Sequence, residues 1–119
     1  MTPSSTTEGR RSRTPIRLSK VRLAEMIEEA TVDAYGESEQ ATGWFTMLEQ
    51  HLQLPFETKV LGIRVIVASI DLRDGGQITA ICTRGQDRQA ISLVDLPLPS
   101  PKPAGSEWIE AYRYWLGGR

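Results

Sequence analysis

Residues 55–93 read PFETKVLGIRVIVASIDLRDGGQITAICTRGQDRQAISL, and apolar side chains recur there at every second position. A period of two is typical of β-strands with one buried face. Within the longest run the apolar residues fall on odd positions up to Val67 and on even positions from Ala68 onward. Because this change of parity moves side chains to the other face, it predicts a bulge or bend near residues 67–69.

Glycine-rich turns divide this stretch into four strands. Gly62 interrupts the first alternation, Asp74-Gly75-Gly76 follows the second, and Gly85-Gln86-Asp87 follows the third. Short turns of this composition favour hairpins between antiparallel neighbours. The pattern therefore predicts a small, strongly bent antiparallel meander of the SH3-like kind.

Two helices are predicted before the sheet, over residues 20–35 and from residue 37 to about residue 53. Ser19 is suited to cap the first helix, and Gly36 is predicted to end it. Acidic residues open the second helix, and Pro55 stops it. The short connection places the two helices next to each other.

After the sheet, a proline-rich segment at residues 94–103 leads into a last helix over residues 107–116. The prolines exclude a central strand, and Leu96 and Leu98 favour a strap packed on its own domain over a PxxP ligand for another protein. The last helix contains two Trp and two Tyr, from Trp108 to Trp115. Such a helix is more often docked core than an exposed stacking platform.

The whole chain has 119 residues, which is the size of one domain, and 39% of them are apolar. We interpret residues 18–119 as that single domain. A single Cys, Cys82, and a single His, His51, exclude a disulfide framework, a zinc cluster and a two-His metal site. Cys82 lies at an apolar strand position and is interpreted as a small buried hydrophobe, and His51 as a structural residue. No apolar run reaches the roughly 18 residues of a membrane helix, so we expect a cytoplasmic protein without a membrane partner.

Residues 1–17 are interpreted as a disordered basic tail. Residues 1–22 hold six basic groups against one acidic group, whereas residues 23–119 hold eight against fourteen. An acidic globular part repels polyanions, so nucleic-acid binding is unlikely except through the tail. The alternative is that the tail is an inert extension.

Carboxylates cluster at the joint between the two predicted helices. Asp33, Glu37 and Glu39 lie there, close to the carbonyl groups that end the first helix. Carboxylate and carbonyl oxygens are the ligands that Ca²⁺ prefers, although a solvated acidic face would explain the same pattern. An EF-hand beginning at Asp71 is excluded, because Arg73, Gly75 and Cys82 occupy positions that need oxygen ligands.

Several blocks resemble the cyanobacterial-type calcium-binding protein family, which has no EF-hands. They are EEATVDAYGESEQ (28–40), PFETKVLG (55–62), LVDLPLP (93–99) and EWIEAYRYW (107–115). The resemblance covers about residues 20–116 and implies Ca²⁺ binding, as a buffer or regulator of the free ion. Asp33, Glu37 and Glu39 match its acidic block and Asp95 its LVDLPLP block, and we take these four as candidate ligands. Glu107 and Glu110 match the last block.

The predicted fold class is α+β, with two N-terminal helices and one C-terminal helix packed on the bent sheet. The favoured function is calcium binding through surface carboxylates. The alternative is a protein or nucleic-acid interaction module built on the SH3-like sheet. An enzyme is disfavoured, because no nucleophile motif accompanies the lone His51.

Overall fold

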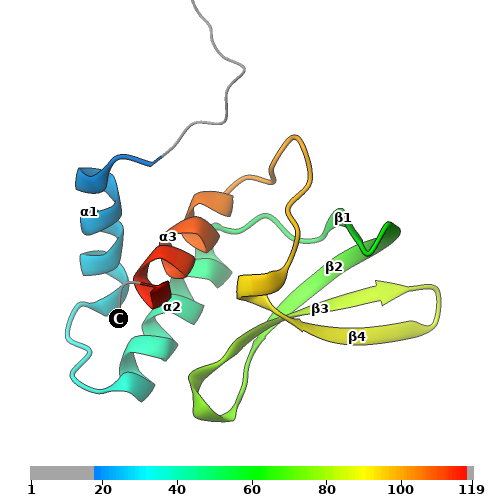
Figure 1. Ribbon diagram of the computed structural model, residues 1–119. Helices are drawn as coiled ribbons and strands as arrows, with labels where there is room; N and C mark the ends of the chain where they lie inside the picture. Colours follow the sequence, from blue (N-terminus) through cyan, green and yellow to red (C-terminus); the bar gives the residue numbers. More distant parts are fainter. Residues whose placement is uncertain (1–17, 118–119) are drawn as a thin grey trace, which may run out of the picture.

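The computed structural model describes residues 18–117, in which three helices lie together and a four-stranded sheet extends away from them (Figure 1). The tail predicted for residues 1–17 lies outside the described residues. The elements in chain order are α1 (Lys20–Thr31), α2 (Glu37–His51), β1 (Phe56–Val60), β2 (Ile63–Leu72), β3 (Ile78–Arg84), β4 (Asp87–Ser92) and α3 (Ser106–Gly117). The α+β fold class predicted from the sequence is confirmed.

The start of α1 follows the predicted capping chemistry, but its end does not. The Ser19 hydroxyl accepts a hydrogen bond from the Arg22 backbone N–H at 3.0 Å. Gly36 was the predicted end of the first helix; instead α1 ends at Thr31, and Asp33 adopts the left-handed backbone conformation with φ 58°. Asp tolerates this conformation because its short side chain bonds locally, so the helix can end without a glycine. Gly36 is extended and leads directly into α2.

The sheet is an antiparallel meander in the order β1-β2-β3-β4. Its register shifts between Val67 and Ser69, where the change of parity predicted a bulge. No ladder between β1 and β4 is present in the described sheet, so closure into an SH3-like barrel stays a prediction. The turns that join β1 to β2 and β3 to β4 lie at the end of the sheet remote from the helices (Figure 1).

The core is centred on Trp44 of α2, which has no exposed surface. Its indole ring packs against three rings of α3, at centroid distances of 6.3 Å to Trp108, 5.7 Å to Tyr112 and 5.5 Å to Trp115. The aromatic helix is therefore docked core, as predicted. No described group accepts a hydrogen bond from the buried Trp44 indole N–H, so packing alone holds this side chain.

Two glycines allow backbones to touch. A Cβ atom at Gly43 of α2 would overlap the carbonyl oxygen of Ala30, and one at Gly105 would overlap that of His51. Gly43 thus sets the spacing between α1 and α2. Gly105, with φ +85°, brings the start of α3 onto the end of α2.

The proline-rich strap packs on its own domain, as predicted. Leu96 is 1% exposed, and the Thr58 hydroxyl of β1 donates a hydrogen bond to the Pro97 carbonyl at 2.7 Å. Arg113 of α3 donates from Nη2 to the carbonyl oxygens of Leu93, at 2.9 Å, and Leu96, at 2.5 Å. The guanidinium therefore fastens the start of the strap to the last helix.

Candidate metal centre

The joint between α1 and α2 exposes carboxylates on a compact turn. The Ala34 backbone N–H donates to the Thr31 carbonyl at 3.0 Å, which closes the turn around Asp33. Glu37 and Glu39 occupy the first turn of α2, and all three acidic side chains are exposed. Their negative charge is favourable at this helix N-terminus.

Glu39 has a structural task at the joint. Its Oε1 accepts a hydrogen bond from the Tyr35 backbone N–H at 2.8 Å, which ties the connecting turn to α2. An Asp or Glu that satisfies a backbone donor before a helix stabilises the helix start. To bind a metal ion, Glu39 would use its second oxygen or give up this bond.

Asp95 lies on a different part of the molecule, in the single helical turn Leu93–Asp95 that begins the strap. Arg113 lies against this turn. Burial lowers the pKa of Arg113, and the charges of Glu110 and Asp95 act in the opposite direction. Lys102 also donates to Glu110 Oε2 at 3.0 Å. The carboxylates around the strap therefore already face cationic side chains.

The predicted carboxylates do not form a finished metal site. Calcium takes about six to eight oxygen ligands. Between residues 18 and 117, no group of three or more His, Cys, Asp or Glu side chains is placed to hold a metal ion. The structure therefore keeps Asp33, Glu37 and Glu39 on one joint without converging them, and it holds Asp95 on another element. Their role as ligands stays a prediction.

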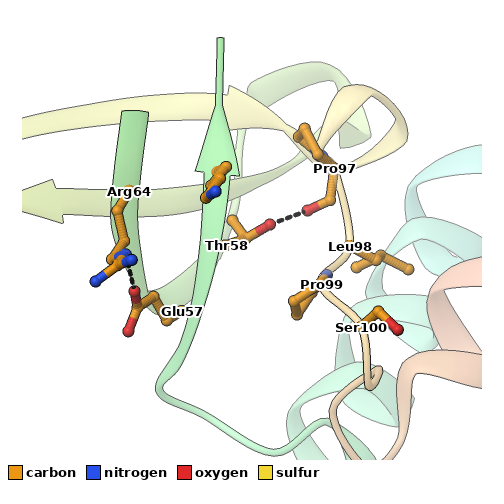
Figure 2. A pocket seen from close by; sticks show the side chains of 8 residues that line it. Glu57, Thr58, Arg64, Pro97, Leu98, Pro99 and Ser100 are labelled. Carbon is orange, nitrogen blue, oxygen red and sulfur yellow. Dashed lines mark hydrogen bonds and ion pairs between the residues drawn. The ribbon is translucent and has the colours of Figure 1, made fainter. Parts of the chain in front are cut away.

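A pocket of about 420 Å³ between β1 and the strap offers a poor environment for a cation (Figure 2). Lys59 and Arg64 line it, and Glu57, its one carboxylate, is paired with Arg64 at 2.6 Å. The pocket therefore carries more positive than negative charge.

The two residues with reactive side chains are both accounted for by packing. The His51 ring stacks on Trp108 with centroids 5.0 Å apart. Cys82 is 3% exposed, and burial raises the pKa of its thiol, which keeps it protonated. Both agree with the structural interpretations made from the sequence.

A family model described as calcium binding, of the CcbP type, matches residues 24–116. The match spans nearly all of the described chain, including both helices of the joint and the strap. The chain belongs to the CcbP calcium-binding family.

Solved structures share the CcbP fold with this chain. The crystal structure of Anabaena CcbP has a TM-score of 0.63 and 22% identity, and the match covers 87% of this chain and 95% of that one. A calcium-binding protein in the calcium-binding form has a TM-score of 0.62 and 21% identity, over 84% of this chain and 96% of that one. Comparison with curated proteins finds no match.

The segment that begins at Asp71 does not have EF-hand geometry, because strands and not helices flank it. That segment is the turn between β2 and β3, with Gly75 and Gly76 at φ 84° and 86°. The hairpin turn accounts for both glycines, as the sequence predicted. Within the described residues, no helix combines the length and apolar character needed to cross a membrane.

Proposed function

We propose that this CcbP-family protein binds Ca²⁺ at the joint between α1 and α2 and acts as a buffer or regulator of the free ion. The observation that carries the proposal is the family match over residues 24–116. We further propose that it is no enzyme and works in the cytoplasm, with residues 18–119 as the binding domain and residues 1–17 as a separate basic tail.

The strap is the less favourable location for the ion, because its carboxylates already face cationic side chains. Asp95 and Glu110 face Arg113, and Lys102 pairs with Glu110, so an ion there would compete with fixed cations. At the joint, Asp33 lies on an exposed turn beside the first turn of α2, where Glu37 and Glu39 are also exposed. An ion bound at this turn reduces the repulsion among these carboxylates.

We propose that the ligands converge only when the ion arrives. The carboxylates are separated in the structure, so their side chains must rotate into place around the ion. They lose conformational freedom when they do so. Such a site has lower affinity than a rigid, prearranged one. Weak and rapidly reversible binding suits a buffer.

Calcium titration followed by thermal unfolding of the full chain tests the proposal. An ion present at about ten times its Kd adds about 1.4 kcal/mol to the free energy of unfolding. For a domain of this size we expect the midpoint to rise by about 5–10 °C. The Asp33→Asn, Glu37→Gln double variant should lose most of this rise and be at least as stable without calcium.

The matched control is the Glu49→Gln, Asp87→Asn double variant, which removes the same two charges at the end of α2 and at the β3–β4 turn, both away from the joint (Figure 1). We expect it to keep the calcium-dependent rise. If wild type shows no rise at millimolar calcium, the proposed function fails. If the Asp33 and Glu37 variant keeps the full rise, the site lies elsewhere, with Asp95 as the next candidate.

A further inference from the structure

The remote end of the sheet contains a hollow of about 430 Å³, which we call the tip hollow. Its lining residues belong to the β1–β2 and β3–β4 hairpins, whose turns lie far from the helices (Figure 1). Its apolar lining includes Val60, Ile63, Val65 and Ile91, and Arg84 and Arg88 also line it.

The tip hollow continues the core-facing side of the sheet. Val65 and Val67 are two residues apart on β2, so their side chains share one face of the sheet. Their cross-strand partners, Thr58 and Cys82, lie on the same face. Val67 is covered completely, whereas Ile63 at the tip is 48% exposed. An apolar face that extends beyond the residues packed on it is typical of an interaction surface.

Leu61, beside the tip hollow, strengthens this interpretation. It is 96% exposed and has a left-handed backbone with φ 52°. Two-residue hairpin turns of this kind favour Asn, and Leu there costs about 1–2 kcal/mol. Fold stability therefore explains neither its conformation nor its exposure.

Charge defines what the tip hollow accepts. Arg84 and Arg88 are exposed and make no ion pair with any residue between 18 and 117, while Asp87 is the one carboxylate in the lining. An occupant that brings an apolar side chain with an adjacent carboxylate satisfies both the apolar lining and these arginines.

The joint between α1 and α2 has this composition. Val32 and Tyr35 are 65% and 88% exposed, and they flank the exposed carboxylate of Asp33. The hydrogen bond between Glu39 and the Tyr35 backbone holds the turn on the start of α2, so the turn is presented from a rigid base. The joint and the tip hollow lie at opposite ends of the molecule, so they can meet only between two copies (Figure 1).

We propose that the joint of one copy docks into the tip hollow of a second copy, with Tyr35 as the anchor and Asp33 facing Arg84 and Arg88. A buried Tyr side chain removes about 150–250 Å² from water, which suits a weak and reversible contact. Because the two surfaces differ, association is head-to-tail and adds further copies unless rotation closes a ring. This inference goes beyond calcium binding.

Sedimentation velocity of the full chain, in a calcium chelator and over a range of protein concentrations, tests the proposal. We expect the mean mass of wild type to rise continuously with concentration and to fall when salt is added. The joint variant Asp33→Asn, Tyr35→Ser and the hollow variant Arg84→Glu, Arg88→Glu each keep one intact surface. Each should associate at least about tenfold more weakly on its own.

An equimolar mixture of these two variants distinguishes the proposal from other modes of association. The intact joint of the hollow variant can dock into the intact hollow of the joint variant, so the mixture should form a 1:1 dimer and stop there. The Lys20→Glu, Arg22→Glu variant is the control, because it reverses two charges on α1 outside both surfaces, and it should associate like wild type.

Three results would overturn the proposal: a monomeric wild type at millimolar concentration, undiminished association of either variant, or a mixture that stays monomeric. Undiminished association of either variant would show that copies meet through other surfaces. A monomeric wild type would indicate that the tip hollow binds a different protein. Circular dichroism of each variant verifies that it is folded. Because calcium is chelated throughout, the result is independent of the calcium titration.

Discussion

At the helical end of the molecule Trp44 is completely buried, whereas at the sheet tip Leu61 is 96% exposed. The helical end is held together by contacts between residues that are far apart in the sequence, including backbone contacts that only glycine permits. The tip also carries large apolar side chains, but no other part of the described chain covers them fully. The difference indicates that the helical end provides the stability of the domain, while the tip is available for contacts with other molecules.

The largest loss is expected at the centre of the helical end. Trp44→Ala should lower the free energy of unfolding by about 3–5 kcal/mol, because it leaves a cavity among three aromatic rings. Denaturant unfolding measures this loss. Trp44→Phe is the matched variant and should lose much less, since it keeps a ring and removes an indole N–H that has no acceptor. Equal losses would show that the rings do not form the core.

Gly43→Ala should cost about 3 kcal/mol, although it adds a single methyl group. The new Cβ would overlap the Ala30 carbonyl oxygen, so α1 and α2 must separate. Thr42→Ala, at the preceding exposed position of α2, is the control and should be close to neutral. Thermal unfolding compares the two, and a stable Gly43→Ala protein would disprove the close helix contact.

The smallest effect is expected at the tip, with the opposite sign. Leu61→Asn should raise the free energy of unfolding by up to about 1 kcal/mol, because Asn adopts the left-handed conformation more readily. Leu61→Val should lower it, since a branched side chain is strained there. Loss of stability in Leu61→Asn would mean that Leu61 packs within its own chain.

Local patterns in the sequence predicted much of the fold. The parity change at Val67–Ser69 located the register shift, and alternating prolines and leucines predicted a packed strap. These features depend on neighbouring residues, which a sequence displays directly. The contact of Gly43 with Ala30 and that of Gly105 with His51 could not be predicted, because each depends on two helices meeting.

The candidate site was predictable in composition and not in geometry. The clustering of Asp33, Glu37 and Glu39 is visible in the sequence, but the bond from Tyr35 to Glu39 is not. The end of α1 was placed too late, because Gly36 is the more familiar helix terminator and Asp33 takes its role. Arg113 of α3 faces Asp95 of the strap, and Lys102 of the strap pairs with Glu110 of α3, so only the fold reveals these pairings between elements.

The packing of α3 against Trp44 has a consequence for synthesis of the protein. Residue 44 leaves the ribosome long before Trp108, Tyr112 and Trp115 have been made, and translation adds about 5–20 residues each second. The growing chain therefore holds its central tryptophan in water for several seconds. Folding is completed only when the last helix emerges, so a nascent chain that stalls before residue 106 exposes its unfinished core to chaperones and proteases.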